Sequence, residues 1–381
     1  MVKGQPLEPA ALDSVAPLAV DWLAVGVVVG VLAALLLAYY LSIGRQACAR
    51  FATGLRLGLL GLLAKELRSR SRGWRPMWVL TFYLLVMAAG VAGFLALARK
   101  ASGTVMPTTG TLLYFALAVG SVMLLAFITP ALTSGAISGE RERRTLELLL
   151  VTRASALGLV TGKLLGSLFY ILFLLFASLP AFALVYLFGG VPPFYLGMTL
   201  AVATVTAVAH ASLGLLLSAV LKRTVVASVI AYLLVILVVI GLPFLSAASA
   251  VMRGDRSTEP PPVYMSASPI VSLSSVLTMG QPGSSAELGQ EAMRFLFAGG
   301  RSTIPSSSVP ITQVVYVVGY DEITNVPKTV VRWAPWVYHF AFSGAFTLFC
   351  LLASALALAP VKPWRAWRRR RRSRQPALSR A

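Results

Sequence analysis

Acidic residues are scarce in this chain of 381 residues. It contains 13 Asp and Glu against 33 Lys and Arg, which gives a formal net charge of +20. None of the acidic residues lies in the interior of a long apolar run. Carriers driven by protons or sodium ions usually bind the ion at a carboxylate within the membrane. The sequence therefore argues against a secondary transporter.

Thiol and metal chemistry also lack candidate residues. The chain has two cysteines and two histidines. Cys48 lies in a basic segment and Cys350 inside an apolar run, which argues against a disulfide, and no group of residues has metal-ligand spacing. No Ser/His/Asp set, Cys/His set or dinucleotide fingerprint is evident in the sequence. We expect no catalytic residue, no metal and no cofactor in this chain.

The segment 158–163, GLVTGK, resembles a phosphate-binding loop only in part. The Walker pattern needs four residues between its glycines and a Ser or Thr after the lysine. Here three residues separate Gly158 from Gly162, and Leu164 follows Lys163. We therefore predict no nucleotide-binding site, so that any work driven by ATP would require a separate subunit.

Apolar residues dominate the composition. The chain is 57% hydrophobic and 12% charged, and its mean hydropathy is +0.81. This composition excludes an ordinary soluble globular protein and predicts an all-α polytopic membrane protein. Seven runs are long enough to span a bilayer. They are residues 22–43, 77–98, 111–133, 164–188, 195–221, 225–245 and 336–359.

Basic residues cluster in short segments beside these runs, as the positive-inside rule predicts for cytoplasmic loops. Arg45, Arg50 and Arg56 follow the first run, and a strongly basic tail follows the last. We therefore expect a multi-pass protein of the cell inner (plasma) membrane, with its N-terminus outside and its C-terminus in the cytoplasm. Nucleic-acid binding is the other interpretation of a pI near 10.7. It is disfavoured because the basic segments alternate with spans, so no nucleic-acid partner is expected.

These patterns divide the chain into segments. Residues 55–76 are expected to form an amphipathic helix at the cytoplasmic interface, with its cations near anionic membrane lipid; a plain basic linker is the alternative. The insert 246–335 carries six cations and six anions, a balance that supports an external location. A helix after Ser284 and a strand over 311–318 are expected within it. The segments are an external N-terminus with the first span (1–54), the interfacial helix (55–76), five spans (77–245) with a charged cytoplasmic loop (134–163), the insert (246–335), the last span (336–360) and a basic cytoplasmic tail (361–381).

The charged loop is the most distinctive segment. Six charges lie within residues 140–147, between two apolar runs. Such a cluster is expensive in hydrocarbon, so it must lie in water. Leu146, Leu149 and Leu150 recur at three- and four-residue spacing, which predicts a short amphipathic helix with one apolar face. A helix of this kind can dock its apolar ridge into a groove on a partner.

The string SGERERRTLELLL from Ser138 to Leu150, then Val-Thr-Arg153 and Gly162-Lys163, resembles the signature of ABC-2 type transporter permeases. In that family an E-x-E-x-x-T-L-E-x-L-L segment follows the second span of a six-span core. Arg153 departs from the family, where relatives often carry a proline. The motif covers a small part of the chain, but the order of the spans extends the resemblance to nearly all of it.

The resemblance implies a six-span core preceded by one extra span, with segment 55–76 as an elbow helix. It implies a coupling helix over 140–150 that docks into a separate ABC ATPase subunit, and pairing with a second, identical or different, permease subunit. Transport would be export. The residues implied to contact the ATPase subunit are Glu140, Glu142, Arg143, Thr145, Leu146, Glu147, Leu149 and Leu150.

Two alternative functions are consistent with some of these features. One is an ABC-type complex that transmits force or signal across the membrane without moving a solute, with the insert 246–335 as its effector. The other is a polytopic membrane enzyme, which would need a catalytic set that the sequence does not offer. The sequence does not specify a substrate.

His210 is the one ionisable side chain, apart from Tyr and Cys, deep within a predicted span. It is a candidate for lining a polar path through the membrane. The preferred interpretation is a neutral histidine that hydrogen-bonds to a neighbouring helix, because polar side chains often join helices in bilayers.

Overall fold

The computed structural model describes residues 74–102, 107–146, 156–188, 191, 193–245, 248, 263–277, 313–320 and 327–358. The predicted first span (22–43), all of the interfacial helix before Trp74, the predicted helix after Ser284 and the basic tail lie outside the described residues.

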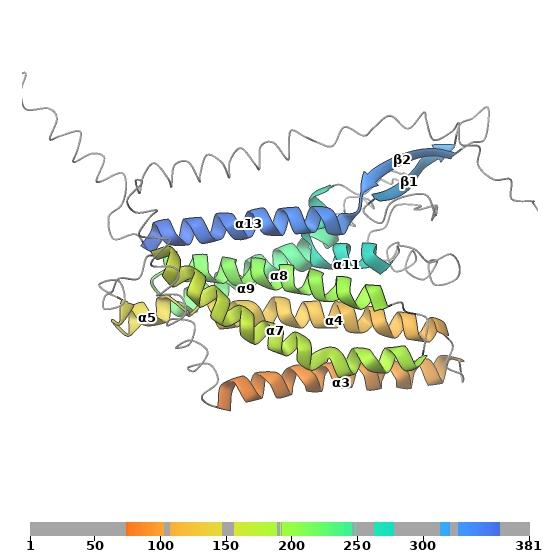
Figure 1. The fold of residues 1–381 in the computed structure, drawn as a ribbon, viewed down its shortest axis with the longest axis horizontal. Helices are drawn as coiled ribbons and strands as arrows, with labels where there is room; N and C mark the ends of the chain where they lie inside the picture. Colours follow the sequence, from red (N-terminus) through yellow and green to blue (C-terminus); the bar gives the residue numbers. More distant parts are fainter. Residues whose placement is uncertain are drawn as a thin grey trace, which may run out of the picture.

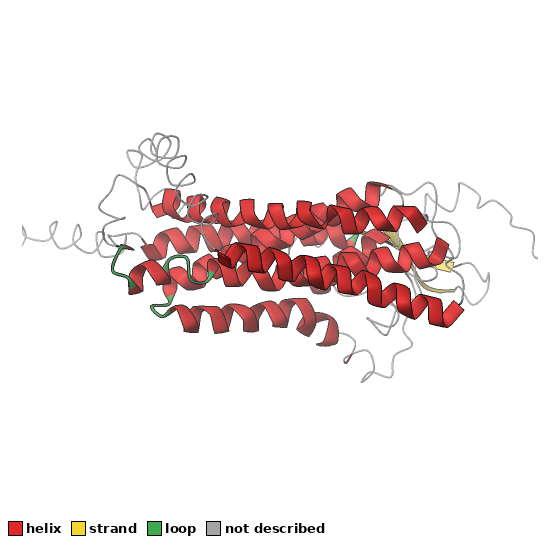
Figure 2. Ribbon diagram, turned by 90° about the horizontal axis from the view of Figure 1, so that it is seen from below, coloured by secondary structure: helices red, strands yellow, loops and turns green. Residues whose placement is uncertain are grey.

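Within the described part of the chain, six helices are long and apolar enough to cross a membrane. They lie side by side along a common direction, as Figures 1 and 2 show. Each contains most of a span predicted from hydropathy, so the all-α membrane architecture is confirmed. The helices are α3 (Trp74–Ser102), α4 (Pro107–Thr133), α7 (Ala156–Phe188), α8 (Pro193–Val220), α9 (Thr224–Ile236) with its continuation to Leu245, and α13 (Pro335–Leu358).

Helix α8 is the centre of the bundle, packing against α4, α7, α9 and α13. Its buried positions are rich in small residues, among them Ala203, Ala207 and Ala211. Small residues let helices approach closely in a membrane, where packing drives association. At Gly214 the approach is so close that an added Cβ would lie 2.1 Å from Thr133 Oγ1 on α4.

The two ends of the bundle differ. The short helix α5 (Ser138–Glu142) lies at one end. Helix α11 (Pro269–Leu277), the 3₁₀ helix η3 (Val263–Ala267) and the strands β1 (Gln313–Tyr320) and β2 (Pro327–Trp333) lie at the other (Figure 1). The predicted strand over 311–318 therefore corresponds to β1, shifted by two residues. Its antiparallel partner β2 was not predicted.

Helices α9 and α7 differ from regular helices, or from the prediction, in three ways. Helix α9 continues as a π-helical turn, η2 (Leu237–Gly241), before an α-helical end at Leu245. Helix α7 contains Pro180 without ending there. It also begins at Ala156, before the predicted start of the span at residue 164, so that Lys163 lies on a spanning helix.

Candidate functional site

The loop between α4 and α7 carries the charged motif, and its backbone is tightly folded. Helix α5 ends at Glu142, and Arg144 has a positive φ of 58°. The Thr145 N–H donates to the Glu140 carbonyl and the Arg144 N–H to the Arg141 carbonyl. These two bonds are the Schellman pattern that ends a helix, with Arg144 in the left-handed position usually held by glycine.

This turn corrects the prediction of one helix over 140–150. The helix breaks at Arg143–Thr145, and helical conformation is found again at Leu146. Leu146 was predicted to face a partner, but it is 6% exposed and packs in a cluster with Ile137, Leu159 and Leu215. Because its own chain covers it, it is not a docking ridge in this conformation. Glu147, Leu149 and Leu150 lie outside the described residues.

Two side chains anchor the loop to α8. Ser218 Oγ accepts hydrogen bonds from the backbone N–H groups of Ile137 and Ser138, both at 2.9 Å. The Arg141 guanidinium donates to the carbonyls of Ala219 and Leu221, at 3.0 and 3.1 Å. These carbonyls lie at the C-terminal end of α8, where backbone acceptors lack helical partners and a cation is favourable. Arg141 thus caps a spanning helix.

Glu142 performs the matching task at α9. Its Oε1 accepts a hydrogen bond of 2.8 Å from the Thr224 backbone N–H, at the first turn of that helix. A carboxylate there satisfies a free donor and complements the positive end of the helix dipole. The hydrogen bonds from the Thr224 backbone and side chain lower the pKa of Glu142 below its ordinary value, although the side chain is exposed.

Glu140 connects the loop to α7. Its Oε1 lies 2.8 Å from Lys163 Nζ, and the Lys163 side chain is only 3% exposed. The sequence placed Lys163 at the end of the charged loop (134–163); in the structure it lies on α7, buried and paired. A buried ammonium needs such a partner, because its desolvation is expensive. The second carboxylate oxygen of Glu140 is buried and has no hydrogen-bond partner within the described part of the chain.

Three consecutive residues remain at the surface after these contacts. Arg143, Arg144 and Thr145 are exposed. The Thr145 hydroxyl donates to the Glu140 carbonyl at 3.2 Å. For the Arg143 side chain the described residues offer no hydrogen bond or ion pair. We call Arg143–Thr145 the exposed turn.

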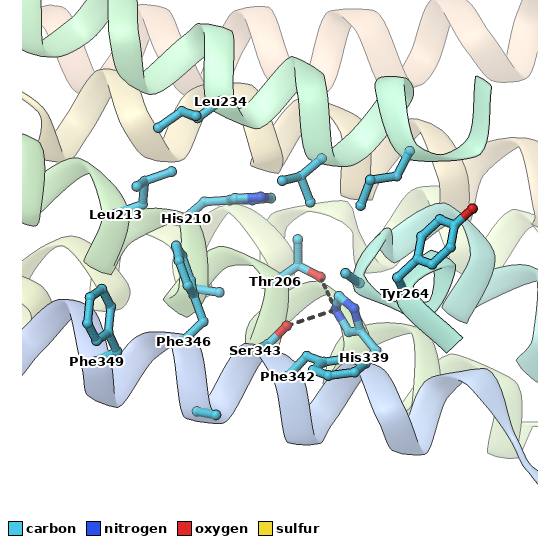
Figure 3. Close-up of a pocket in the computed structure, with 15 residues that line it drawn as sticks. Thr206, His210, Leu213, Leu234, Tyr264, His339, Phe342, Ser343, Phe346 and Phe349 are labelled. Atoms are coloured by element: carbon cyan, nitrogen blue, oxygen red, sulfur yellow. Dashed lines mark hydrogen bonds between the residues drawn. The ribbon is translucent and has the colours of Figure 1, made fainter. Parts of the chain in front are cut away.

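The two histidines lie away from this loop, in a cavity between α8, α9 and α13. His339 has partners on both ring nitrogens. Its Nδ1 donates to the Ser266 carbonyl at 3.1 Å. Its Nε2 lies 2.9 Å from Thr206 Oγ1 (Figure 3). His210 is 6% exposed, and its Nδ1 has no hydrogen-bond partner among the described residues. The interhelical hydrogen bond that we preferred for His210 is therefore not found at this nitrogen.

Sequence reasoning found the charged loop but not most of its internal partners. These partners are Ser218, Thr224 and the carbonyls at the end of α8, which lie some 80 residues away along the chain. A signal did exist, since an Arg and a Glu beside predicted helix ends are the residue types that cap them. Among the described residues no group of His, Cys, Asp and Glu could hold a metal ion.

These features define a multi-pass α-helical membrane protein with a charged, anchored loop between its second and third described spans. A family model described as "ABC-2 family transporter protein" matches residues 60–359. The chain therefore belongs to the ABC-2 transporter family, as the motif led us to expect. A search of curated proteins finds no match to it.

Proposed function

We propose that this chain is the permease subunit of an ABC transporter and that it forms the path for export. It would pair with a second permease subunit and couple to a separate ABC ATPase subunit through the segment 140–150. Family membership supports the transporter setting, in which an ATPase partner is expected. The coupling site rests on the motif and on the geometry of the loop, and the direction of transport rests on the family resemblance alone.

The observation that carries the proposal is how firmly one short loop is tied to several spans. It continues directly from α4, pairs with Lys163 of α7, and caps the ends of α8 and α9 through Arg141 and Glu142. A force on this loop therefore acts on four spanning helices at once. Rigid-body motion of packed helices is an established way to convert a local push into a change of access.

Within the described part of the loop, the exposed turn is available for a partner. Arg143 and Arg144 offer two guanidinium groups, which suit an acidic surface and bidentate contacts with carboxylates. Leu146, in contrast, serves the interior of the chain. The residues proposed to contact the ATPase subunit are therefore fewer than the motif implied. Glu140 and Glu142 stabilise the conformation of the loop, and Arg143 is the first candidate for contact with the ATPase subunit.

Charge supports a cytoplasmic position for this end of the bundle. This end carries Arg141, Arg143, Arg144, Lys222 and Arg223, and α13, after which the basic tail follows in the sequence, ends there. The positive-inside rule assigns such an end to the cytoplasm, where an ATPase subunit has access to ATP. The insert 246–335 would then be outside, and the chain would end in the cytoplasm.

Co-purification tests this proposal. The tagged full-length chain is isolated in mild detergent, and associated proteins are identified by mass spectrometry and an ATPase assay. We expect a nucleotide-binding subunit with the native chain and at least tenfold less of it with Arg143→Glu, because the new carboxylate would face an acidic surface of the partner and like charges repel. Lys100→Glu is the matched control, since Lys100 is exposed on α3 at the opposite end of the bundle.

Each outcome is informative. If the native chain brings down no ATPase subunit, the permease proposal fails. If Arg143→Glu retains the subunit, or if Lys100→Glu loses it equally, the assignment of the exposed turn is wrong while the permease proposal stands.

A further inference from the structure

The membrane region contains a cavity that the coupling mechanism does not use. It has a volume of about 670 Å³ and lies between α8, α9 with its π-helical turn, α13 and η3 (Figure 3). This volume lies within the range of roughly 300–1,000 Å³ that is usual for small-molecule sites. The cavity is thus large enough for a ligand.

The chemistry of the walls restricts what can bind. They are almost wholly apolar, with Phe342, Phe346 and Phe349 contributed by α13. No Lys, Arg, Asp or Glu is among the lining residues. An ionised group would be unpaired here and expensive to desolvate. The walls therefore favour an uncharged molecule with a large apolar part.

One polar group in the wall needs a partner. His210 lines the cavity, more than nine-tenths buried, and its Nδ1 has no hydrogen-bond partner among the described residues. His210 is ten residues before the end of α8 at Val220, which places it about 15 Å along the helix from that end. At such a depth hydrocarbon offers no replacement partner, and an unsatisfied buried polar group is costly.

The opposite wall has an irregular backbone. Val238 lines the cavity from η2, the π-helical turn of α9. Isolated π-helical turns within α-helices occur frequently at functional sites. This feature is independent of the histidine and of the cavity volume.

We propose that this cavity binds an uncharged, lipid-like molecule that carries a hydroxyl group. Its apolar body lies against the phenylalanines of α13, and its hydroxyl forms a hydrogen bond with His210 Nδ1. A hydroxyl can donate or accept, so it satisfies either tautomer of the imidazole. His339 does not compete for the ligand, because both of its ring nitrogens are already bonded.

Photo-labelling tests the proposal with the full-length chain in phosphatidylcholine nanodiscs. The probe is a long-chain alcohol that carries a diazirine in its chain. We expect saturable labelling of peptides from α13 and α9, which excess unlabelled long-chain alcohol removes. An alkyl sulfonate of the same chain length, which stays ionised in a bilayer, should label these peptides at least several-fold less. Labelling that never saturates, or equal labelling by the sulfonate, overturns the proposal.

Two variants locate the site. Ala345→Phe fills the cavity from α13 and should abolish saturable labelling, whereas Ala341→Phe, exposed one turn earlier and not part of the wall, should leave it unchanged. His210→Leu keeps an apolar wall and should weaken binding of the alcohol roughly five- to tenfold, the loss expected for one hydrogen bond with a buried partner.

A hydrocarbon probe without the hydroxyl should bind the native chain and the His210→Leu variant with equal affinity. If Ala345→Phe does not fold, the His210→Leu comparison decides alone, and equal affinity of the alcohol for both forms contradicts the proposal. The readout needs neither nucleotide nor an ATPase subunit, so it is independent of the proposed coupling function.

Discussion

Single side chains in the loop between α4 and α7 have two different tasks. Arg141 and Glu142 bond to the ends of spanning helices, and Glu140 pairs with a buried lysine. Arg143 and Arg144 remain exposed. The sequence indicated that these charged residues lie outside the hydrocarbon region. It could not show which of them bond within the chain, because their partners lie on helices that are distant in the sequence.

Ser218 is the residue on which the inner contacts of the loop depend most. In Ser218→Ala two backbone N–H groups lose their acceptor in a buried place, at a cost of about 1–3 kcal/mol for each such group. We expect a lower thermal unfolding temperature in detergent, measured by intrinsic fluorescence. Ser167→Ala on α7 is the control, because the hydrogen bonds described for this buried hydroxyl stay within its own helix turn. Equal stability of the two variants would contradict the anchoring role.

Arg144 offers a prediction about backbone conformation. Its φ of 58° favours glycine, since other L-residues lose roughly 1–2 kcal/mol in the left-handed region. Arg144→Gly should therefore keep or raise thermal stability, whereas Arg144→Val should lower it because a β-branched residue fits this region worst. The measurement is thermal unfolding of both variants. A lower unfolding temperature for the glycine variant would mean that the turn is not the one described.

Whole elements were easier to predict than their ends. The long apolar runs gave the six described spans, because hydrocarbon requires a length and a composition that are readable in sequence. The start of α7 was placed too late, since Lys163 resembled a boundary until Glu140 was found to pair with it. The break at Arg144 was missed because the turn lacks its usual glycine. Strand β2 was missed because it begins at a proline and includes Lys328 and Arg332.

Contact between α4 and α8 gives a prediction at the scale of elements. In Gly214→Ala the new Cβ would lie 2.1 Å from Thr133 Oγ1 and 3.3 Å from the Ser134 backbone nitrogen, so Thr133 and the backbone beside it must shift. Overpacking of this kind costs about 1–3 kcal/mol. We expect a clear loss of thermal stability, together with a weaker link between the loop and the bundle.

Gly197→Ala is the matched control for this experiment. It lies on the same helix, and nothing lies within 4 Å of its added Cβ. Each variant adds one Cβ atom to α8, and the two differ in the space around that atom. If both variants unfold at the same temperature, close approach at Gly214 does not contribute to the packing of α4 against α8.

At the scale of the whole molecule, the bundle has two specialised regions. One end carries the anchored loop and the exposed turn, and the membrane region between α8, α9 and α13 contains the cavity. The first belongs to the proposed coupling with an ATPase subunit, and the second to the proposed binding of an uncharged lipid-like molecule. The central bundle helix α8 connects them, because Ser218 holds the loop and His210 lines the cavity.

Site-specific cross-linking from the exposed turn tests the central claim most directly. A photo-reactive amino acid is placed at Arg143 in one variant and at Lys100 in the other, and each is irradiated in native membranes. The account predicts a cross-link to an ABC ATPase subunit from position 143 and none from position 100, since the two positions lie at opposite ends of the bundle. Cross-linking from position 100 alone, or from neither position in membranes that contain the subunit, would contradict it.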